Sequence, residues 1–294
     1  DNCIRYSNPE EKELSMCFNF HHLKVDYKNG NKWELMDTNR KELKRLFEEW
    51  QIGMQEHNGW NSLFWCNHDQ PRIVSRMGNE GTYWKQSAKM LAAAVHLMRG
   101  TPYIYQGEEI GMPNAHFKDI NDYRDVESLN YYEILLKEGK TKEEAIKTLQ
   151  ERSRDNSRTP MQWSDEKNAG FSDVIPWISL PDHYKEINVE NELRDEDSIY
   201  YFYKKLIELR KEKEVIQEGT IEFFEKDDDD LLAYERNYKE EHLVVFNNLT
   251  EKEKEVEIPQ LWTSYHKLIG NYDTENMKEN KVVLRPYETL VLEK

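Results

Sequence analysis

The first 110 residues repeat one pattern that restricts the fold: a short, continuously apolar run that ends in polar residues. The runs are residues 14–20, 61–66 and 103–105. The first two are followed by longer segments with helical spacing, residues 40–57 and 83–98. Strands that are apolar on both faces are typical of parallel sheets covered by crossover helices. The pattern therefore predicts an α/β fold.

Polar side chains gather at the carboxyl end of each apolar run. His21 and His22 follow the first, residues 67–69 (Asn-His-Asp) follow the second, and residues 106–109 follow the third. The carboxyl ends of parallel strands meet at one edge, where α/β barrels build their substrate sites. We therefore expect the functional residues there.

The remaining chain changes character twice. Residues 114–197 form a long, charged, mostly helical excursion, and residues 198–213 have the spacing of a helix with Ser198 as its N-cap. After Gly219, short β-type runs alternate with charged turns, which predicts an antiparallel β domain. The acidic run 227–230 is expected at a solvated hairpin tip rather than in a calcium loop. We predict two domains, residues 1–216 and 217–294.

The charge balance disfavours several classes of partner. Lys and Arg number 41 against 57 Asp and Glu, a formal net charge of −16, which argues against nucleic acid and anionic membranes. No apolar stretch approaches the roughly 18 to 20 residues of a membrane span, and the first residues do not resemble a signal peptide. Cys3, Cys17 and Cys66 form no CxxC pattern, which favours reduced thiols and a cytoplasmic location.

Residues 64–72, FWCNHDQPR, are the most informative segment. An apolar strand that ends in Asn67, His68 and Asp69 presents an amide, an imidazole and a carboxylate at one rim. These groups suit the binding of vicinal hydroxyls and the stabilisation of positive charge on a sugar ring. By pattern alone, a polar strand end with a purely structural role fits equally well.

This segment resembles the fourth signature region of the α-amylase superfamily of glycoside hydrolases, in its oligo-1,6-glucosidase and phosphotrehalase branch. Residues 100–112 (GTPYIYQGEEIGM) resemble the eighth strand of that family and its exit loop, and residues 154–163 (RDNSRTPMQW) resemble a loop that returns over the active site. The resemblance implies the C-terminal part of a (β/α)₈ TIM barrel, strands six to eight, followed by a small antiparallel β-sandwich domain.

The resemblance also implies roles for particular residues. Asp69 would stabilise the transition state without being the nucleophile or the acid. His68 would bind the same sugar, beside Asn67. His22 would lie near the leaving group, and Arg158 would help to hold the nonreducing glucose. The resemblance implies no metal ion and no organic cofactor.

The catalytic carboxylate pair of such retaining enzymes is not found in the sequence. The family's nucleophile lies in a GxRxD motif, which does not occur, and the first residues, DNCIRY, resemble the segment after the acid Glu. We therefore expect the C-terminal half of a longer enzyme, inactive alone and prone to self-association through the exposed edge of strand six. Glu108 and Glu109 resemble structural residues of the exit loop, and Asp125 and Glu127 are expected on a solvated helix face.

The loop of residues 18–33 indicates the substrate. Lys24, Lys28 and Lys32 follow the histidine pair in a strongly acidic protein, which indicates a local anion site. FNFHHLKVDY resembles the phosphotrehalase version of this loop, which implies retaining hydrolysis of trehalose 6-phosphate, with Lys24 and Lys32 as ligands of the phosphorylated disaccharide. Three alternatives stay open: solvated surface lysines, an oligo-1,6-glucosidase, and a non-catalytic amylase-like partner protein.

Overall fold

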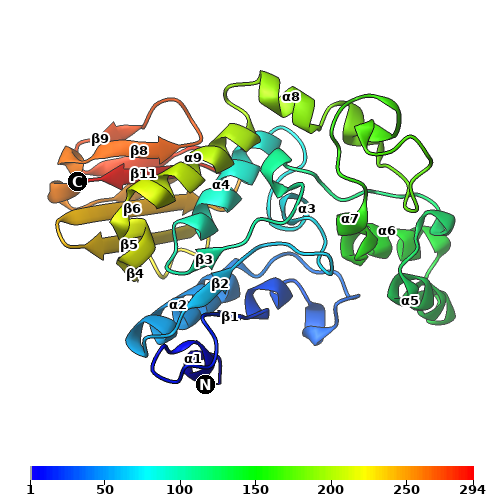
Figure 1. The fold of residues 1–294 in the computed structure, drawn as a ribbon, viewed down its shortest axis with the longest axis horizontal. Helices are drawn as coiled ribbons and strands as arrows, with labels where there is room; N and C mark the ends of the chain where they lie inside the picture. The colour runs from blue at the N-terminus through cyan, green and yellow to red at the C-terminus, as the bar shows by residue number, and fades with distance from the viewer. Residues whose placement is uncertain (1) are drawn as a thin grey trace.

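The computed structural model describes residues 2–294 and contains a small sheet of three parallel strands (Figure 1). The strands are β1 (Cys17–Phe18), β2 (Asn61–Leu63) and β3 (Thr101–Pro102), with β2 in the centre. Cys17 lies opposite Asn61, and Ser62 lies opposite Thr101. Because the strands run in the same direction, their carboxyl ends lie at one edge of the sheet.

The paired strands are shorter than the apolar runs in the sequence, because only two or three residues of each strand have a hydrogen-bonded neighbour. β3 begins two residues before the expected run of residues 103–105. The first residue of that run adds one further hydrogen bond, from the Tyr103 N–H to the Leu63 carbonyl (2.7 Å). Phe18 and Phe20 are exposed, and their rings contact Phe64. Within residues 2–294, β1 pairs with β2 alone, so its outer edge is open.

Two long helices follow β1 and β2, as the helical spacing predicts: α2 (Arg40–Glu56) and α4 (Trp84–His96). α2 begins at Asn39, whose side chain accepts a hydrogen bond from the Glu42 N–H (3.0 Å). α4 is mostly buried because it lies between the small sheet and the antiparallel strands (Figure 1). α1 (Asn2–Ser7) and α3 (Ile73–Met77) are short.

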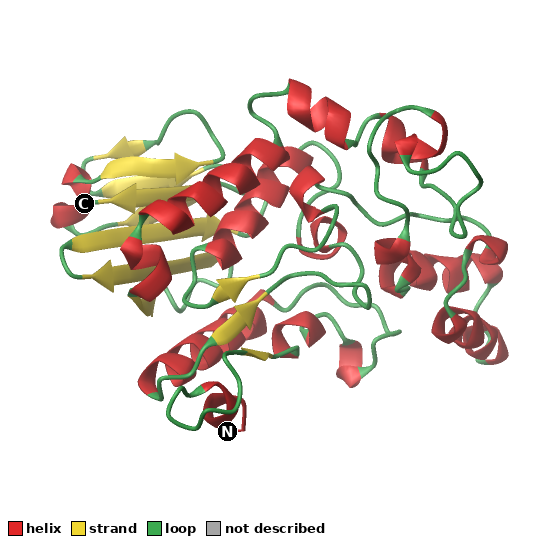
Figure 2. Ribbon diagram, in the orientation of Figure 1, coloured by secondary structure: helices red, strands yellow, loops and turns green. Residues whose placement is uncertain are grey.

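The charged excursion is helical, and its residues 126–158 lie at the far end of the molecule from the antiparallel strands (Figure 2). Its helices are α5 (Val126–Lys137), α6 (Lys142–Arg152), α7 (Asp155–Arg158) and α8 (Val189–Arg194). A capping box of Thr141 and Glu144 starts α6. α5 and α6 share an apolar cluster with Trp33, which attaches the loop before α2 to the excursion.

Two further helices precede the antiparallel strands: α9 (Ile199–Glu212) and α10 (Glu214–Glu218). Ser198 caps α9 by accepting a hydrogen bond from the Tyr201 N–H (3.3 Å), which confirms the expected helix start. Short 3₁₀ helices lie at η1 (His21–Lys24), η2 (Lys28–Gly30), η3 (Glu108–Ile110), η4 (Ile120–Asp122), η5 (Lys167–Gly170), η6 (Asp182–Lys185) and η7 (Gln260–Ser264). No helix within residues 2–294 has the length and apolar character needed to cross a bilayer.

The strands after residue 219 form two antiparallel sheets. The five-stranded sheet has the order β4-β5-β6-β11-β8, and the three-stranded sheet has the order β7-β10-β9. The strands are β4 (Thr220–Phe224), β5 (Leu231–Tyr238), β6 (Glu241–Asn248), β7 (Lys254–Glu257), β8 (His266–Gly270), β9 (Met277–Lys278), β10 (Lys281–Leu284) and β11 (Thr289–Glu293).

The five-stranded sheet is buried on both faces. Leu231 and Ala233 on β5 belong to a cluster with residues of the smaller sheet. Their neighbours Leu232 and Tyr234 pack toward α4, where the Tyr234 hydroxyl donates to the Ala94 carbonyl (3.0 Å). This double burial accounts for the continuous apolar run Leu243–Phe246 within β6.

The acidic run 227–230 lies in the turn between β4 and β5, as expected. The turn is not a free, solvated tip, however, because it packs on α2. Lys44 donates to the Glu225 carbonyl (2.8 Å), and Arg40 pairs with Asp230 (2.7 Å). These contacts join the antiparallel sheet to the helix that follows β1.

Candidate active site

The segment Asn67 to Asp69, here called the rim, follows the central strand β2 at its carboxyl end. The Asp69 N–H donates to the Asn67 side-chain oxygen (2.8 Å), so Asn67 stabilises the turn that holds the rim. The side chains of His68 and Asp69 are 70% and 46% exposed. Both are therefore accessible to a ligand.

Arg158 holds the rim in place. Its Nη2 lies 2.8 Å from Asp69 Oδ1, and its Nε donates to the His68 carbonyl (2.8 Å). His68 Nε2 lies 3.4 Å from the other carboxylate oxygen of Asp69. One guanidinium thus fixes both the backbone of the rim and the orientation of its carboxylate.

Arg154, four residues before Arg158, connects the rim to α5. Its Nη2 lies 2.6 Å from Asp125 Oδ1, and its Nη1 lies 3.6 Å from Asp69 Oδ1. Burial alone would raise the pKa of Asp125, but hydrogen bonds from Arg154 and Ser128 lower it below the ordinary value. Asp125 is therefore a buried anion that also caps α5.

Lys32 joins this network from the loop between η2 and α2. Its Nζ lies 3.1 Å from Glu127 Oε2, and the same oxygen lies 3.3 Å from Arg154 Nε. Burial lowers the pKa of Lys32, although the Glu127 carboxylate acts in the opposite direction. The Lys32 amine also lies over the ring of Trp33 (4.7 Å), which stacks on Tyr131. Ion pairs thus connect Lys32 with Asp69 in the rim, through Glu127 and Arg154.

The other two lysines of the loop lie outside this network. Lys24 and Lys28 are exposed, and neither forms an ion pair with any residue in the described part of the chain, 2–294. Among the lysines of this loop in the described chain, Lys32 is the one that ion pairs link to the rim, through Glu127 and Arg154.

His22 is separated from the exposed side of the rim. Its side chain is buried, and its Nε2 lies 2.8 Å from the Phe64 carbonyl oxygen. Its ring packs against Phe47 and Trp65. Burial lowers the pKa of His22 to about 4, so the ring is neutral at pH 7. The structure thus places His22 between Phe47 and Trp65, and its place near a leaving group stays a prediction.

A buried ion triad anchors the loop that carries Lys32. Asp26 Oδ1 lies 2.7 Å from Arg76 Nη2, its other carboxylate oxygen bonds Arg152, and both arginines are almost fully buried. Arg76 also donates to the Leu23 carbonyl (2.7 Å). Burial would raise the pKa of Asp26, but the two guanidinium groups lower it below its ordinary value.

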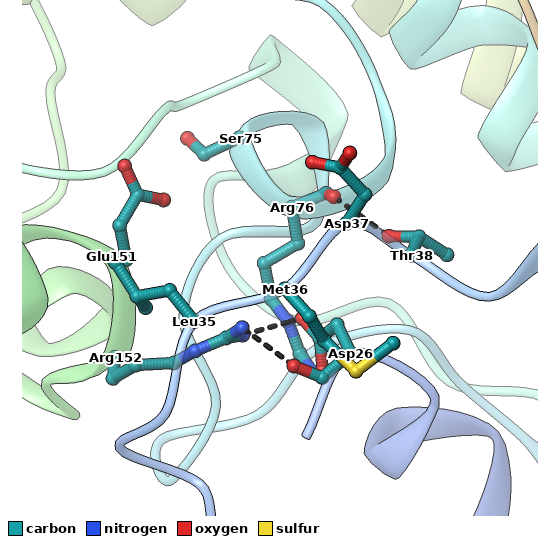
Figure 3. A pocket seen from close by; sticks show the side chains of 9 residues that line it. All are labelled: Asp26, Leu35, Met36, Asp37, Thr38, Ser75, Arg76, Glu151 and Arg152. Atoms are coloured by element: carbon teal, nitrogen blue, oxygen red, sulfur yellow. Dashed lines mark hydrogen bonds and ion pairs between the residues drawn. The ribbon is translucent and has the colours of Figure 1, made fainter. Parts of the chain in front are cut away.

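Figure 3 shows this triad from the pocket that opens beside it, with the Arg152 side chain directed at Asp26. The pocket has a volume of about 380 Å³. The other residues that line it are Leu35, Met36, Asp37, Thr38, Ser75 and Glu151. Two acidic side chains besides Asp26, those of Asp37 and Glu151, thus line the pocket.

Glu108 and Glu109 lie in the loop after β3. Burial raises the pKa of Glu108 to about 8, although the nearby Arg72 acts to lower it. Glu109 accepts a hydrogen bond from the Gly107 N–H (2.7 Å) within the same loop. These contacts agree with structural roles. Nowhere in residues 2–294 do three or more His, Cys, Asp or Glu side chains form a group that could hold a metal ion.

The expectation of a solvated helix face for Asp125 and Glu127 is wrong for Asp125, which is 3% exposed, and incomplete for Glu127, which is 39% exposed and paired. The reason is Arg154, which bonds both carboxylates. Its role had one sequence signal: Arg154 and Arg158 are four residues apart, a spacing that places two side chains on the same face of a helical turn.

Comparisons with known proteins agree with this architecture. The family model described as alpha amylase, catalytic domain matches residues 1–219. The model described as alpha-amylase SusG C-terminal domain matches residues 231–291. Together the two matches cover the parallel strands, the excursion and most of the antiparallel strands.

Individual relatives point to the same family. The chain is 49% identical to a trehalose-6-phosphate hydrolase of Bacillus subtilis and 46% identical to an oligo-1,6-glucosidase of Bacillus cereus, over 99% and 97% of its own length. It superposes on the crystal structure of Bacillus licheniformis trehalose-6-phosphate hydrolase with a TM-score of 0.96 and 53% identity, covering 99% of this chain and 53% of that one. The chain spans about half the length of these relatives. It belongs to the α-amylase family, family 13 of the glycoside hydrolases.

Proposed function

We propose that this chain is the C-terminal half of a glycosidase that hydrolyses trehalose 6-phosphate to glucose and glucose 6-phosphate with retention of configuration. The observation that carries the proposal is the ion network that runs from Asp69 through Arg154 and Glu127 to Lys32. It brings a carboxylate suited to sugar hydroxyls and a cation suited to a phosphate monoester to one site. The relatives named trehalose-6-phosphate hydrolase support the same substrate.

In this proposal, Asp69 accepts hydrogen bonds from sugar hydroxyls and stabilises the positive charge that develops on the ring. Arg158 orients the carboxylate through its hydrogen bond to Asp69 Oδ1 (2.8 Å). His68 offers an exposed imidazole beside it. Lys32 binds the phosphate, and Lys24 is exposed and available as a second ligand.

We further propose that β1, β2 and β3 are strands six, seven and eight of a (β/α)₈ barrel, within a domain of residues 1–216 that precedes a β-sandwich domain of residues 217–294. Their parallel order, with helices between them, supports this assignment. The bond-breaking carboxylates then lie outside this chain, since a retaining mechanism needs two carboxyl groups about 5 to 5.5 Å apart. Asp69 alone provides no route for cleavage.

A cytoplasmic location is part of the same proposal. The thiols of Cys17 and Cys66 are buried and form no disulfide. They support this location because structural disulfides persist mainly in oxidising compartments.

The test compares this chain with the longer protein that contains it, by glucose release from trehalose 6-phosphate and from trehalose. We expect the longer protein to prefer the phosphorylated sugar and this chain to release no glucose from either. In the longer protein, Asp69→Asn should lower kcat by at least about a hundredfold. Asp173→Asn, an exposed carboxylate on the excursion, is the matched control. Equal rates on the two sugars would contradict trehalose 6-phosphate as the preferred substrate. Turnover by this chain alone would contradict the proposal that the two catalytic carboxylates lie outside it.

An oligo-1,6-glucosidase is the second candidate. Two observations favour it: Lys32 is already paired with Glu127, and the chain is 46% identical to the Bacillus cereus enzyme. In that case the longer protein would hydrolyse isomaltose faster than trehalose 6-phosphate, and the same assay would separate the two functions.

A further inference from the structure

One carboxylate oxygen of Glu127 lies between two cations from different parts of the chain. Glu127 Oε2 is 3.1 Å from Lys32 Nζ and 3.3 Å from Arg154 Nε. Lys32 comes from the loop before α2, and Arg154 comes from the start of α7. A phosphate oxygen held by a lysine and an arginine would occupy the same place. The Glu127 carboxylate therefore occupies the place that the phosphate of a substrate would take between Lys32 and Arg154.

The positive charges of the network are balanced by its own carboxylates, so no unpaired cation of the network is available to an incoming anion. Three cations, Lys32, Arg154 and Arg158, face three carboxylates, those of Asp69, Asp125 and Glu127. A phosphate monoester that approaches this balanced network gains little unless one carboxylate leaves. Binding of the phosphate to Lys32 and Arg154 therefore requires an exchange of anions.

Glu127 is the carboxylate that is free to leave. Asp125 is buried and caps α5 through Ser128, so it cannot leave without exposing the helix end. Asp69 is held by Arg158 in the rim. Glu127 has a side chain that is 39% exposed, and its only ion-pair partners in the described chain are Lys32 and Arg154. A rotation about its side-chain bonds would move its carboxylate into solvent.

We propose that Glu127 is an internal counter-ion which the phosphate of the substrate displaces from Lys32 and Arg154. Arg154 is then a phosphate ligand together with Lys32, and Glu127 determines specificity by competing with anions. A ligand with one carboxylate gains no binding free energy by replacing the Glu127 carboxylate, because the two groups have the same charge. A phosphate dianion gains binding free energy, because it offers three acceptor oxygens and a higher charge. This inference rests on the proposed function, because it assumes a phosphorylated substrate.

The experiment measures steady-state kinetics of the longer protein that contains this chain, with trehalose 6-phosphate and with trehalose. Glu127→Gln removes the competing charge, so KM for trehalose 6-phosphate should fall by about three- to tenfold, and KM for trehalose should fall by less, because trehalose carries no phosphate. Glu127→Ala should act in the same direction. Glu133→Gln, an exposed carboxylate on the same helix, is the matched control and should change nothing.

A double variant shows whether the gain comes from the proposed cations. Lys32→Met alone should raise KM for the phosphorylated sugar, and adding Glu127→Gln should then restore less affinity than it gains in the parent protein, because the two side chains interact directly. Full additivity of the two changes would overturn the inference. An unchanged or raised KM in both Glu127→Gln and Glu127→Ala would overturn it as well.

A second readout separates this inference from the proposed function. Titration with inorganic phosphate, followed by ³¹P NMR, needs no catalysis. Should the parent protein show no preference for trehalose 6-phosphate, the proposed substrate is wrong; phosphate that binds more tightly to the Glu127→Gln variant would still support the anion exchange. Equal phosphate affinity in the parent and the variant would overturn the exchange even in an enzyme that prefers trehalose 6-phosphate.

Discussion

Asp26→Asn should destabilise the chain far more than a similar change at an exposed position. The Asp26 carboxylate is 4% exposed and balances two guanidinium groups, those of Arg76 and Arg152. Its replacement by an amide leaves two buried positive charges, and removal of one partner from a buried ion pair costs about 3–5 kcal/mol. The lower end of that range applies, about 3 kcal/mol, because each arginine keeps a backbone carbonyl, Leu23 O or Asp26 O, as an acceptor.

Urea unfolding followed by circular dichroism measures this difference at neutral pH. Asp37→Asn is the matched control, because Asp37 lines the same pocket but is exposed. A loss of about 3 kcal/mol corresponds to a fall in Tm of roughly 5 °C for a chain of this size. A difference between the two variants smaller than about 1 kcal/mol would refute the reasoning, since it would show that the triad is not coupled to folding.

The pH dependence of stability provides an independent check. Although burial alone would raise the pKa of Asp26, Arg76 and Arg152 hold it below its ordinary value. A depressed pKa in the folded state means that the carboxylate stabilises the fold above its unfolded pKa of about 4. That stabilisation is lost as pH falls through the lower folded pKa. The advantage of the parent chain over Asp26→Asn should therefore shrink in acid, and a constant advantage would contradict the assignment.

Three further predictions concern stability and association. Ser198→Ala should lower the free energy of unfolding by about 1 kcal/mol in urea, because it removes the cap of α9. Burial raises the pKa of Glu108 to about 8, so the folded chain keeps this proton and loses stability as pH rises from about 4.5 through 8; Glu108→Gln should leave Tm unchanged near pH 4 and raise it increasingly between pH 5 and pH 9. The open edge of β1 should cause concentration-dependent association in sedimentation velocity, and a monomer at every concentration would count against it.

The order of elements around the site could be predicted from local patterns. Continuous apolar runs that end in polar residues predicted parallel strands, and the structure pairs β1, β2 and β3 in parallel. Helical spacing predicted α2 and α4, and Ser198 predicted the start of α9. The exact strand lengths could not be predicted, because pairing depends on whether a neighbour is present along the whole run.

The residues that form the candidate site, and the ion pairs between them, could be predicted only in part. Asp69 and His68 were expected at an accessible rim because polar residues directly follow a buried strand, and both are exposed. The partners of Asp125 and Glu127 could not be predicted from α5, because the cation that binds both comes from α7. The expected role of His22 depended on a resemblance, whereas its burial depends on the rings of Phe47 and Trp65.

The amino-acid sequence by itself determined the alternation of strands and helices, the helix caps and the family, because periodicity and local hydrogen bonding are properties of neighbouring residues. The tertiary structure decided which charges meet: Lys32 and Glu127 are 95 residues apart in the chain, yet they share a hydrogen bond. The energy of an ion pair depends on distance and burial, and both are fixed only when the loop before α2, α5 and α7 pack together.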